Sequence, residues 1–167
     1  GFDDKYGPSN STYVGQINQI ASDYNSGYYN LKYEAAKLYQ NTNNSLKVRQ
    51  IIPIENVGIE NLKIQRLDGS KSNIDYLGSN VIFKWAVNCW VKGVELDMTC
   101  RHHLEISDCS HIEVSGCFMN EARSTSGSSY GYGTVVSHSS TNCLIENNIF
   151  RKLRHSMGIC WGANSNV

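Results

Sequence analysis

The second half of the chain contains a nine-residue pattern that occurs four times without gaps. The copies span 56–64, 88–96, 111–119 and 142–150, so their starts are 32, 23 and 31 residues apart. Self-similarity at spacings of this size is typical of solenoids, in which each repeat forms one winding that stacks on the next. This repeat constrains the fold more strongly than any other feature of the sequence.

Each copy carries the signature of two strands joined at a corner. In the first copy Val57 and Ile59 alternate with less apolar neighbours, as in a strand, and the alternation then shifts by one position to Leu62 and Ile64. The residues at the shift are Asn61, Gly93, Gly116 and Asn147. Asn and Gly tolerate a left-handed backbone. Each copy therefore predicts a strand, a one-residue left-handed corner and a second strand.

Both strands of each copy are predicted to face one shared interior. Fifteen of the sixteen interior positions are apolar, and they form four ladders: Val57, Cys89, Ile112 and Cys143; Ile59, Val91, Val114 and Ile145; Leu62, Val94, Cys117 and Asn148; and Ile64, Leu96, Met119 and Phe150. Asn148 is the exception, and we expect its amide to be hydrogen-bonded because buried amides are.

A further short strand is expected before three of the copies, at 81–83, 104–106 and 134–136. Three short strands in each winding, with stacked interior ladders, describe an all-β parallel β-helix. A left-handed hexapeptide helix would need a strict six-residue period, which is absent. An antiparallel sandwich is the competing interpretation, but it does not predict a left-handed residue at the same position of every unit.

The chain resembles a known family in its corner sequence, in the spacing of its corners and in two short segments. The segments are Asn-Cys-Trp-Val-Lys-Gly-Val at 88–94 and Leu-Ile-Glu-Asn-Asn-Ile-Phe at 144–150. From 51 to 167 the chain resembles the right-handed parallel β-helix proteins of the pectate-lyase-like superfamily. This superfamily includes polysaccharide lyases, glycoside hydrolases, epimerases, phage tailspikes and surface adhesins. The resemblance implies a right-handed solenoid, a polysaccharide partner and an extracellular or cell-surface location.

Residues 1–50 are expected to lead into the solenoid as one domain with it, because no linker separates the two parts. The alternating segment 13–20 and the segment 28–33 are predicted to form a small antiparallel or irregular excursion, and 34–39 one helical turn. A fifth copy begins at Asn166 and Val167. We therefore expect the solenoid of 51–167 to be truncated, with later coils missing.

Charge and composition exclude several function classes. Fifteen basic residues balance fifteen acidic ones, which argues against a nucleic-acid partner. No apolar run approaches the roughly 20 residues of a membrane span. The six cysteines include no Cys-x-x-Cys pair, which argues against zinc, and the Asp-rich calcium cluster of pectate lyases is absent from these coils. We therefore expect no cofactor and no metal ligands here, with calcium as the alternative that these coils do not support.

In the family that the chain resembles, carbohydrate sites lie on the face of the first strand, bordered by the loops after the third. Those loops are 97–102, 120–133 and 151–156 here, and their register predicts one row of Asp97, Asn120 and Arg151 and another of Arg101, Ser124 and His155. Basic residues crowd this edge: Arg101, His102, His103, Arg123, Arg151, Lys152, Arg154 and His155. Asp97, Glu105 and Glu121 oppose them. Because arginine binds planar anions with two hydrogen bonds, the edge suits uronate or sulfate groups.

Lyase chemistry needs a cation that neutralises the uronate carboxylate and a base that removes the C5 proton. Arg151 or Arg154 is the candidate cation, and His155, His138 or Tyr132 the candidate base. The candidate substrate-binding residues are Arg101, His103, Arg123, Glu121 and Tyr130, the last by stacking on a sugar face. The structural alternative is a solvated loop face with ordinary ion pairs.

The predicted function is that of a secreted or surface protein that degrades or modifies an acidic polysaccharide by lyase-type chemistry. A glycoside hydrolase would need two carboxylates, such as Asp97 with Glu121 or Glu105, but the Gly-His-Gly and Arg-Ile-Lys motifs of polygalacturonases are absent. The alternative is a non-catalytic adhesin or structural β-helix that binds glycan, a surface partner or further coils of the same protein. A phage-type tailspike, which would form a trimer, is the third hypothesis.

Overall fold

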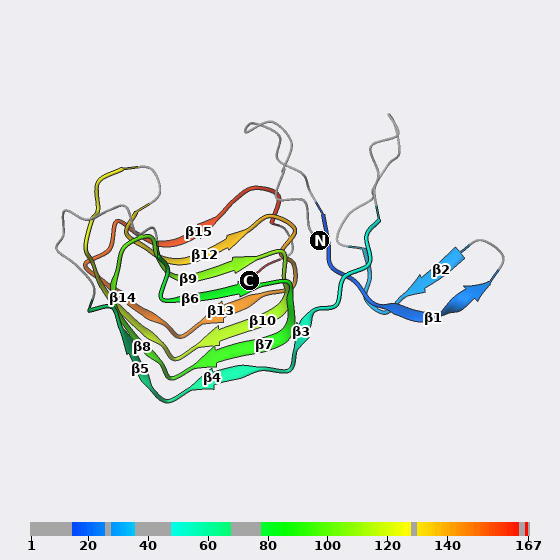
Figure 1. Cartoon of the computed structure of the whole chain (residues 1–167), viewed down its shortest axis with the longest axis horizontal. Helices are drawn as coiled ribbons and strands as arrows, with labels where there is room; N and C mark the ends of the chain where they lie inside the picture. The colour runs from blue at the N-terminus through cyan, green and yellow to red at the C-terminus, as the bar shows by residue number, and fades with distance from the viewer. Residues whose placement is uncertain are drawn as a thin grey trace.

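The computed structural model describes residues 15–25, 28–35, 48–67, 78–127, 130–163 and 166. The four copies of the repeat form successive windings whose strands stack in three parallel sheets (Figure 1). Sheet 1 contains β3 (Ile54–Glu55), β4 (Gly58–Glu60), β7 (Ala86–Lys92), β10 (Ser110–Ser115) and β13 (Leu144–Glu146). Sheet 2 contains β5 (Lys63–Gln65), β8 (Glu95–Thr99), β11 (Phe118–Ala122) and β14 (Ile149–Arg151). Sheet 3 contains β6 (Val81–Lys84), β9 (His102–Ser107), β12 (Tyr132–Ser137) and β15 (His155–Ile159).

The chain passes through sheets 1, 2 and 3 in that order in every winding, and all neighbouring strands within these sheets run parallel. The strands expected at 81–83, 104–106 and 134–136 lie within β6, β9 and β12. The described residues are therefore all-β, in stacked parallel sheets compatible with a β-helix, and the antiparallel sandwich is excluded.

The predicted corners have the predicted backbone. The φ angles of Asn61, Gly93, Gly116 and Asn147 are 52°, 60°, 64° and 55°, all left-handed. Register confirms the ladders on both sides of this corner. Val91 pairs with Ile59 and Val114, and Met119 pairs with Leu96 and Phe150.

The repeat has more left-handed corners than its sequence pattern indicated. The first residue of each copy is also left-handed: Asn56, Asn88, His111 and Asn142. So is a row at the corner where sheet 3 leads into sheet 1: Trp85, Asp108, His138 and Trp161. That corner was not predicted, because its residues are neither Asn nor Gly.

The core runs along the inside of the windings. Leu96, Leu104, Ile106, Val114 and Met119 have no exposed surface. Asn148 is hydrogen-bonded as expected, because its Oδ1 accepts from the Cys117 N–H at 2.9 Å and its Nδ2 donates to the Val114 carbonyl at 2.9 Å.

The first winding is less well covered than the middle ones. Val57 and Leu62 are each 45% exposed. Both belong to the winding of β4 and β5, which have a described neighbouring strand on one side only.

The N-terminal excursion is an antiparallel pair, β1 (Ile20–Asn25) and β2 (Tyr28–Leu31), drawn beside the sheets in Figure 1. The predicted antiparallel excursion is confirmed, but the position expected for its first segment, 13–20, is wrong, because β1 shares only Ile20 with it and 15–19 is not a strand. The expected helical turn at 34–39 falls mostly outside the described residues. No helix suited to crossing a membrane occurs in the described part of the chain.

Candidate functional site

Three aromatic rings lie in one column at the start of sheet 3, with one pair edge-on at 87° and the other tilted at 39°. Tyr132, the first residue of β12, pairs in register with His102 on one side and with His155 on the other. The ring centroids of Tyr132 and His102 are 5.5 Å apart, and those of Tyr132 and His155 are 4.9 Å apart. Residues at one position of successive parallel strands form a column along the stack. We refer to His102, Tyr132 and His155 as the ring column.

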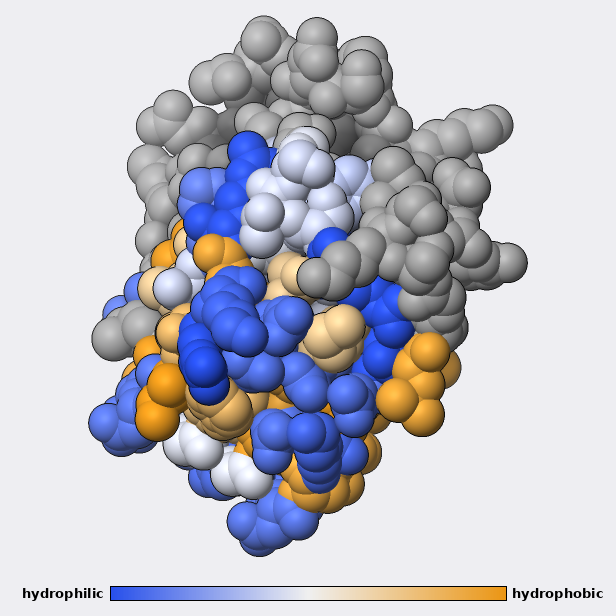
Figure 2. All heavy atoms as spheres, turned by 90° about the vertical axis from the view of Figure 1, so that its left-hand side faces the viewer, coloured by the Kyte–Doolittle hydropathy of each residue, from blue (hydrophilic) through white to orange (hydrophobic). Residues whose placement is uncertain are grey.

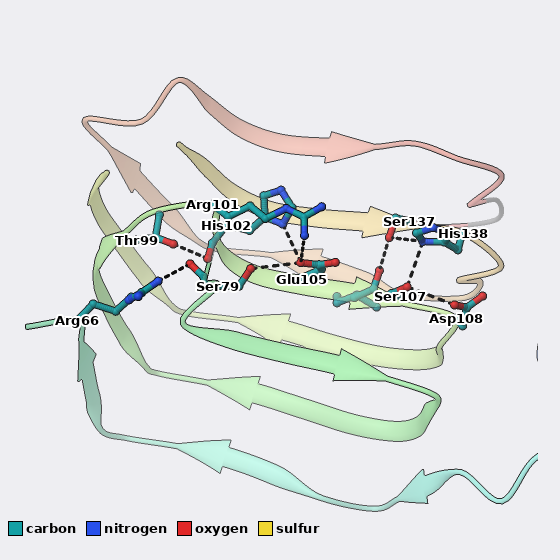
Figure 3. Close-up of polar contacts among 12 residues, drawn as sticks. Arg66, Ser79, Thr99, Arg101, His102, Glu105, Ser107, Asp108, Ser137 and His138 are labelled. Atoms are coloured by element: carbon teal, nitrogen blue, oxygen red, sulfur yellow. Dashed lines mark hydrogen bonds and ion pairs between the residues drawn. The ribbon is translucent and has the colours of Figure 1, made fainter. Parts of the chain in front are cut away.

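The ring column is anchored at its buried end by a carboxylate. His102, only 3% exposed, lies with its Nδ1 3.0 Å from Glu105 Oε2. The same oxygen accepts from Ser79 Oγ at 3.2 Å and lies 3.9 Å from an Arg101 nitrogen (Figure 3). The hydrogen bond from His102 holds the pKa of Glu105 below its ordinary value, burial opposes this, and the charge of Arg101 adds to it. Glu105 is therefore a carboxylate at neutral pH, so the His102 proton sits on Nδ1.

An arginine directly precedes the ring column in two windings, as Arg101-His102 and Arg154-His155. Arg154 is exposed and Arg101 is half-buried. Between them lies Gly131, whose carbonyl accepts from the Arg154 N–H at 2.8 Å. A Cβ at Gly131 would lie 2.7 Å from the Ser124 carbonyl oxygen, and the φ of Gly131 is 76°. Glycine is thus required where the chain at 131 packs against the backbone of Ser124.

His103 does not suit the ligand contact that the sequence predicted for it. The ring has no exposed surface, and neither nitrogen has a partner in hydrogen-bonding geometry. Burial lowers the pKa of His103 to about 4, although the charge of Asp97 and the nearby backbone of Glu121 oppose the shift. His102 is the member of the pair that joins the site. Alternation along the sequence could not predict which of the two histidines joins the site. Three consecutive residues of β9, His102, His103 and Leu104, are all buried, so this part of the strand does not alternate between an inner and an outer side.

Arg151 and its predicted neighbours lie on sheet 2 and not at the ring column. The predicted row of Asp97, Asn120 and Arg151 is confirmed by register. Asp97 accepts from Asn120 Nδ2 at 3.0 Å and lies 3.4 Å from the Lys63 ammonium. Figure 2, which faces this side, shows hydrophilic residues gathered across the middle of the surface. Arg151 therefore belongs to a polar sheet face and not to the ring column.

The remaining substrate-binding candidates make local contacts. Glu121 pairs with Lys152 at 3.0 Å, and Arg123 donates to the Arg66 carbonyl at 2.9 Å. Tyr130 is half-buried, and a Cβ at Gly127 would lie 2.7 Å from its ring. These contacts fit the structural interpretation of the loops better than a binding role.

His138 lies at the opposite end of sheet 3. Its Nδ1 lies 3.0 Å from Ser107 Oγ and 2.9 Å from Ser137 Oγ (Figure 3). His138 comes six positions after Tyr132 along extended chain, which spans about 20 Å. The catalytic candidates are thus divided among three places, and only Tyr132, Arg154 and His155 share one.

The predicted row of Arg101, Ser124 and His155 is wrong, because His155 aligns with Tyr132 and His102. The loops between sheets 2 and 3 explain this difference. They contain two, nine and three residues in the windings of β8, β11 and β14, namely 100–101, 123–131 and 152–154. Residues at the same sequence distance from the Asn or Gly corner are therefore not aligned beyond sheet 2.

Taken together, the start of sheet 3 offers the exposed ring of His155 and the half-buried ring of Tyr132, tilted by 39° to each other. An arginine directly precedes each histidine of the column, and the Glu105 carboxylate holds His102 behind it. Among the residues that the structure describes, no group of His, Cys, Asp and Glu side chains could hold a metal ion. No protein-family model, curated protein or solved structure matches this chain.

Proposed function

We propose that this chain is a right-handed parallel β-helix related to the pectate-lyase-like proteins, and that it binds an acidic polysaccharide at the ring column and cleaves it by β-elimination. The observation that carries the proposal is the stack of His102, Tyr132 and His155 with Arg101 and Arg154 directly before its two histidines. The location is extracellular or at the cell surface, where such polymers occur.

Three features support the finer fold assignment. The sheets are parallel and stacked, the corner residues of the repeat are left-handed Asn or Gly, and the sequence resembles that superfamily from 51 to 167. Crossovers between parallel strands of one sheet are right-handed in nearly all proteins, which favours a right-handed coil here.

Binding follows from the chemistry of the column. Its accessible rings, Tyr132 and His155, lie on neighbouring windings about 4.8 Å apart, so a sugar chain lying along the column meets both, while His102 is buried behind them. Aromatic faces pack against the C–H faces of sugars, and arginine holds a carboxylate with two parallel hydrogen bonds. A uronate polymer presents both groups in every residue.

Elimination uses the exposed end of the column. Arg154 neutralises the uronate carboxylate, which makes the C5 proton more acidic. The neutral imidazole of His155 removes that proton, the electron pair forms the C4–C5 double bond, and the glycosidic C4–O bond breaks. The leaving oxygen takes a proton from the Tyr132 hydroxyl. His102, held by Glu105, packs edge-on against Tyr132 and positions that ring.

The test is the ultraviolet absorbance of unsaturated uronate during incubation with polygalacturonate, alginate and chondroitin. We expect activity on one of these polymers, and a loss of about 100-fold or more in both Arg154→Ala and His155→Gln. Arg151→Ala is the matched control, because Arg151 is also exposed but lies on sheet 2.

Equal losses in the Arg151 and Arg154 variants would refute the ring column as the active site. No absorbance change on any uronate, with polymer binding retained, would refute the lyase and favour the non-catalytic adhesin.

A further inference from the structure

A second row of conspicuous side chains lies at the other end of sheet 3, where each winding turns into sheet 1. Lys84, Ser107 and Ser137 are in register at the ends of β6, β9 and β12, so the residues that follow them share one position. In the last winding Ile159 pairs with Val136, and the Cys160 N–H donates to the Val136 carbonyl. Trp161 therefore continues the row beside His138. We name it the corner row: Trp85, Asp108, His138 and Trp161.

All four residues of the corner row have a left-handed backbone. Their φ angles are 54°, 52°, 56° and 50°. This region is unfavourable for residues with a Cβ, and bulky residues are rare in it. The corner between sheets 1 and 2 uses only Asn and Gly for the same purpose. Bulky left-handed residues also occur elsewhere in the windings, at Met98, Glu121 and Lys152, so the aromatic side chains and not the backbone distinguish this row.

Trp161 is the exposed ring of the corner row, whereas His138 and Trp85 are half-buried and Asp108 is only 7% exposed. Trp161 is 45% exposed, and its ring centroid lies 5.6 Å from that of His138 at an interplanar angle of 42°. Trp85, at the other end, is half-buried, with the Lys84 ammonium 4.9 Å from its ring centroid.

The middle of the row is polar and ordered. The His138 ring is fixed by the hydroxyls of Ser107 and Ser137. The Asp108 carboxylate accepts from Ser107 Oγ at 3.3 Å and from the Ser139 N–H at 3.4 Å. The row is thus one residue wide, with an indole at each end and rigid hydrogen-bonding groups between them.

This pattern fits a carbohydrate better than a protein surface, which would require a contiguous apolar patch. The indoles are three windings apart, about 14 Å, along the direction of the stack. Indole faces pack against sugar C–H groups, and imidazole and carboxylate groups bond to hydroxyls. The row itself contains no arginine, and its carboxylate would repel a uronate. We propose that the corner row is a second carbohydrate-binding site, one that takes a neutral hexose chain and is independent of the proposed lyase site.

The test is a tryptophan-fluorescence titration of the whole chain with neutral oligosaccharides of glucose, galactose and mannose. Two of the three tryptophans of the sequence lie in the corner row. We expect one of these sugars to change the emission, and Trp161→Ala to weaken its binding by about tenfold or more. Trp161→Tyr keeps an aromatic face and should retain most of the binding, which separates a lost contact from a lost fold.

Trp90→Ala is the matched control, because Trp90 lies on sheet 1 and donates from Nε1 to Glu60 at 2.5 Å. An equal loss of binding in the Trp90 and Trp161 variants would overturn the proposal, as would unchanged emission with all three sugars. Binding of uronate polymers alone, lost in Arg154→Ala and kept in Trp161→Ala, would overturn the corner site while leaving the proposed lyase site intact.

Discussion

Substitutions at Gly116 test the left-handed corner on which the stacking of the windings depends. Gly116 has a φ of 64°, is exposed, and a Cβ built there meets only the backbone nitrogen of Gly93 at 3.9 Å. Side-chain size therefore causes no clash, and the backbone conformation alone decides the cost. We consider the series Gly116→Asn, Gly116→Ala and Gly116→Val.

The magnitude follows from two opposing effects. A left-handed backbone costs a residue with a Cβ about 1–2 kcal/mol. Removing glycine from the unfolded chain restores about 0.4–1 kcal/mol, because the unfolded state becomes less flexible. Alanine should therefore lower the free energy of unfolding by roughly 1 kcal/mol. Asparagine should cost less, because it tolerates this region, and valine more, because it is β-branched.

Equilibrium urea unfolding, followed by circular dichroism, measures this order. A loss of about 1 kcal/mol lowers the unfolding midpoint by roughly 0.3–1 M urea for typical slopes. Gly93→Ala is an informative companion, since its Cβ would lie 2.8 Å from Asn61 Oδ1 and the loss should be larger. In an ordinary strand the order would be reversed, with valine best and asparagine worst. A valine variant as stable as the asparagine variant would therefore refute the corner.

Two further predictions concern buried titratable groups. Because burial lowers the pKa of His103 to about 4, the unfolded chain takes up a proton near pH 6.5 that the folded chain refuses. Stability should fall by up to about 3 kcal/mol as the pH drops from 6.5 to 4, and His103→Phe should flatten this dependence in urea titrations; an unchanged slope would contradict it. Burial raises the pKa of Cys109 to about 12 and of Cys143 to about 11, whereas Cys160 is only half-buried. A thiol reagent should modify Cys160 first and the other two only on unfolding, as read by mass spectrometry, and early labelling of Cys109 would show that the core opens.

Much of the fold could be predicted because its causes are local. A residue such as Gly116 or Asn147 permits a left-handed backbone wherever it lies, and alternation decides which side of a strand is apolar. Repetition of these two signals at matching positions is enough to align Val91 with Val114 and Leu96 with Met119. The same counting placed Asp97, Asn120 and Arg151 in one row, because no insertion separates them from the corner.

The site was less predictable because it forms beyond the loops. Tyr132 and His155 were both candidates, but only the register of β12 and β15 shows that they stack. His138 was a candidate by residue type, and the direction of β12 carries it to the far end of the sheet. His102 and His103 have the same sequence signal and are both buried, and only the contact of His102 with Glu105 separates their roles.

The sequence by itself determined the repeat, the four Asn or Gly corners and the apolar ladders, since each depends on backbone tolerance and on a period of two within a few residues. Only the tertiary structure decided which polar side chains meet. The loops 100–101, 123–131 and 152–154 differ in length, so the residues that follow them are aligned by the hydrogen bonds of sheet 3 and not by their distance from the corner.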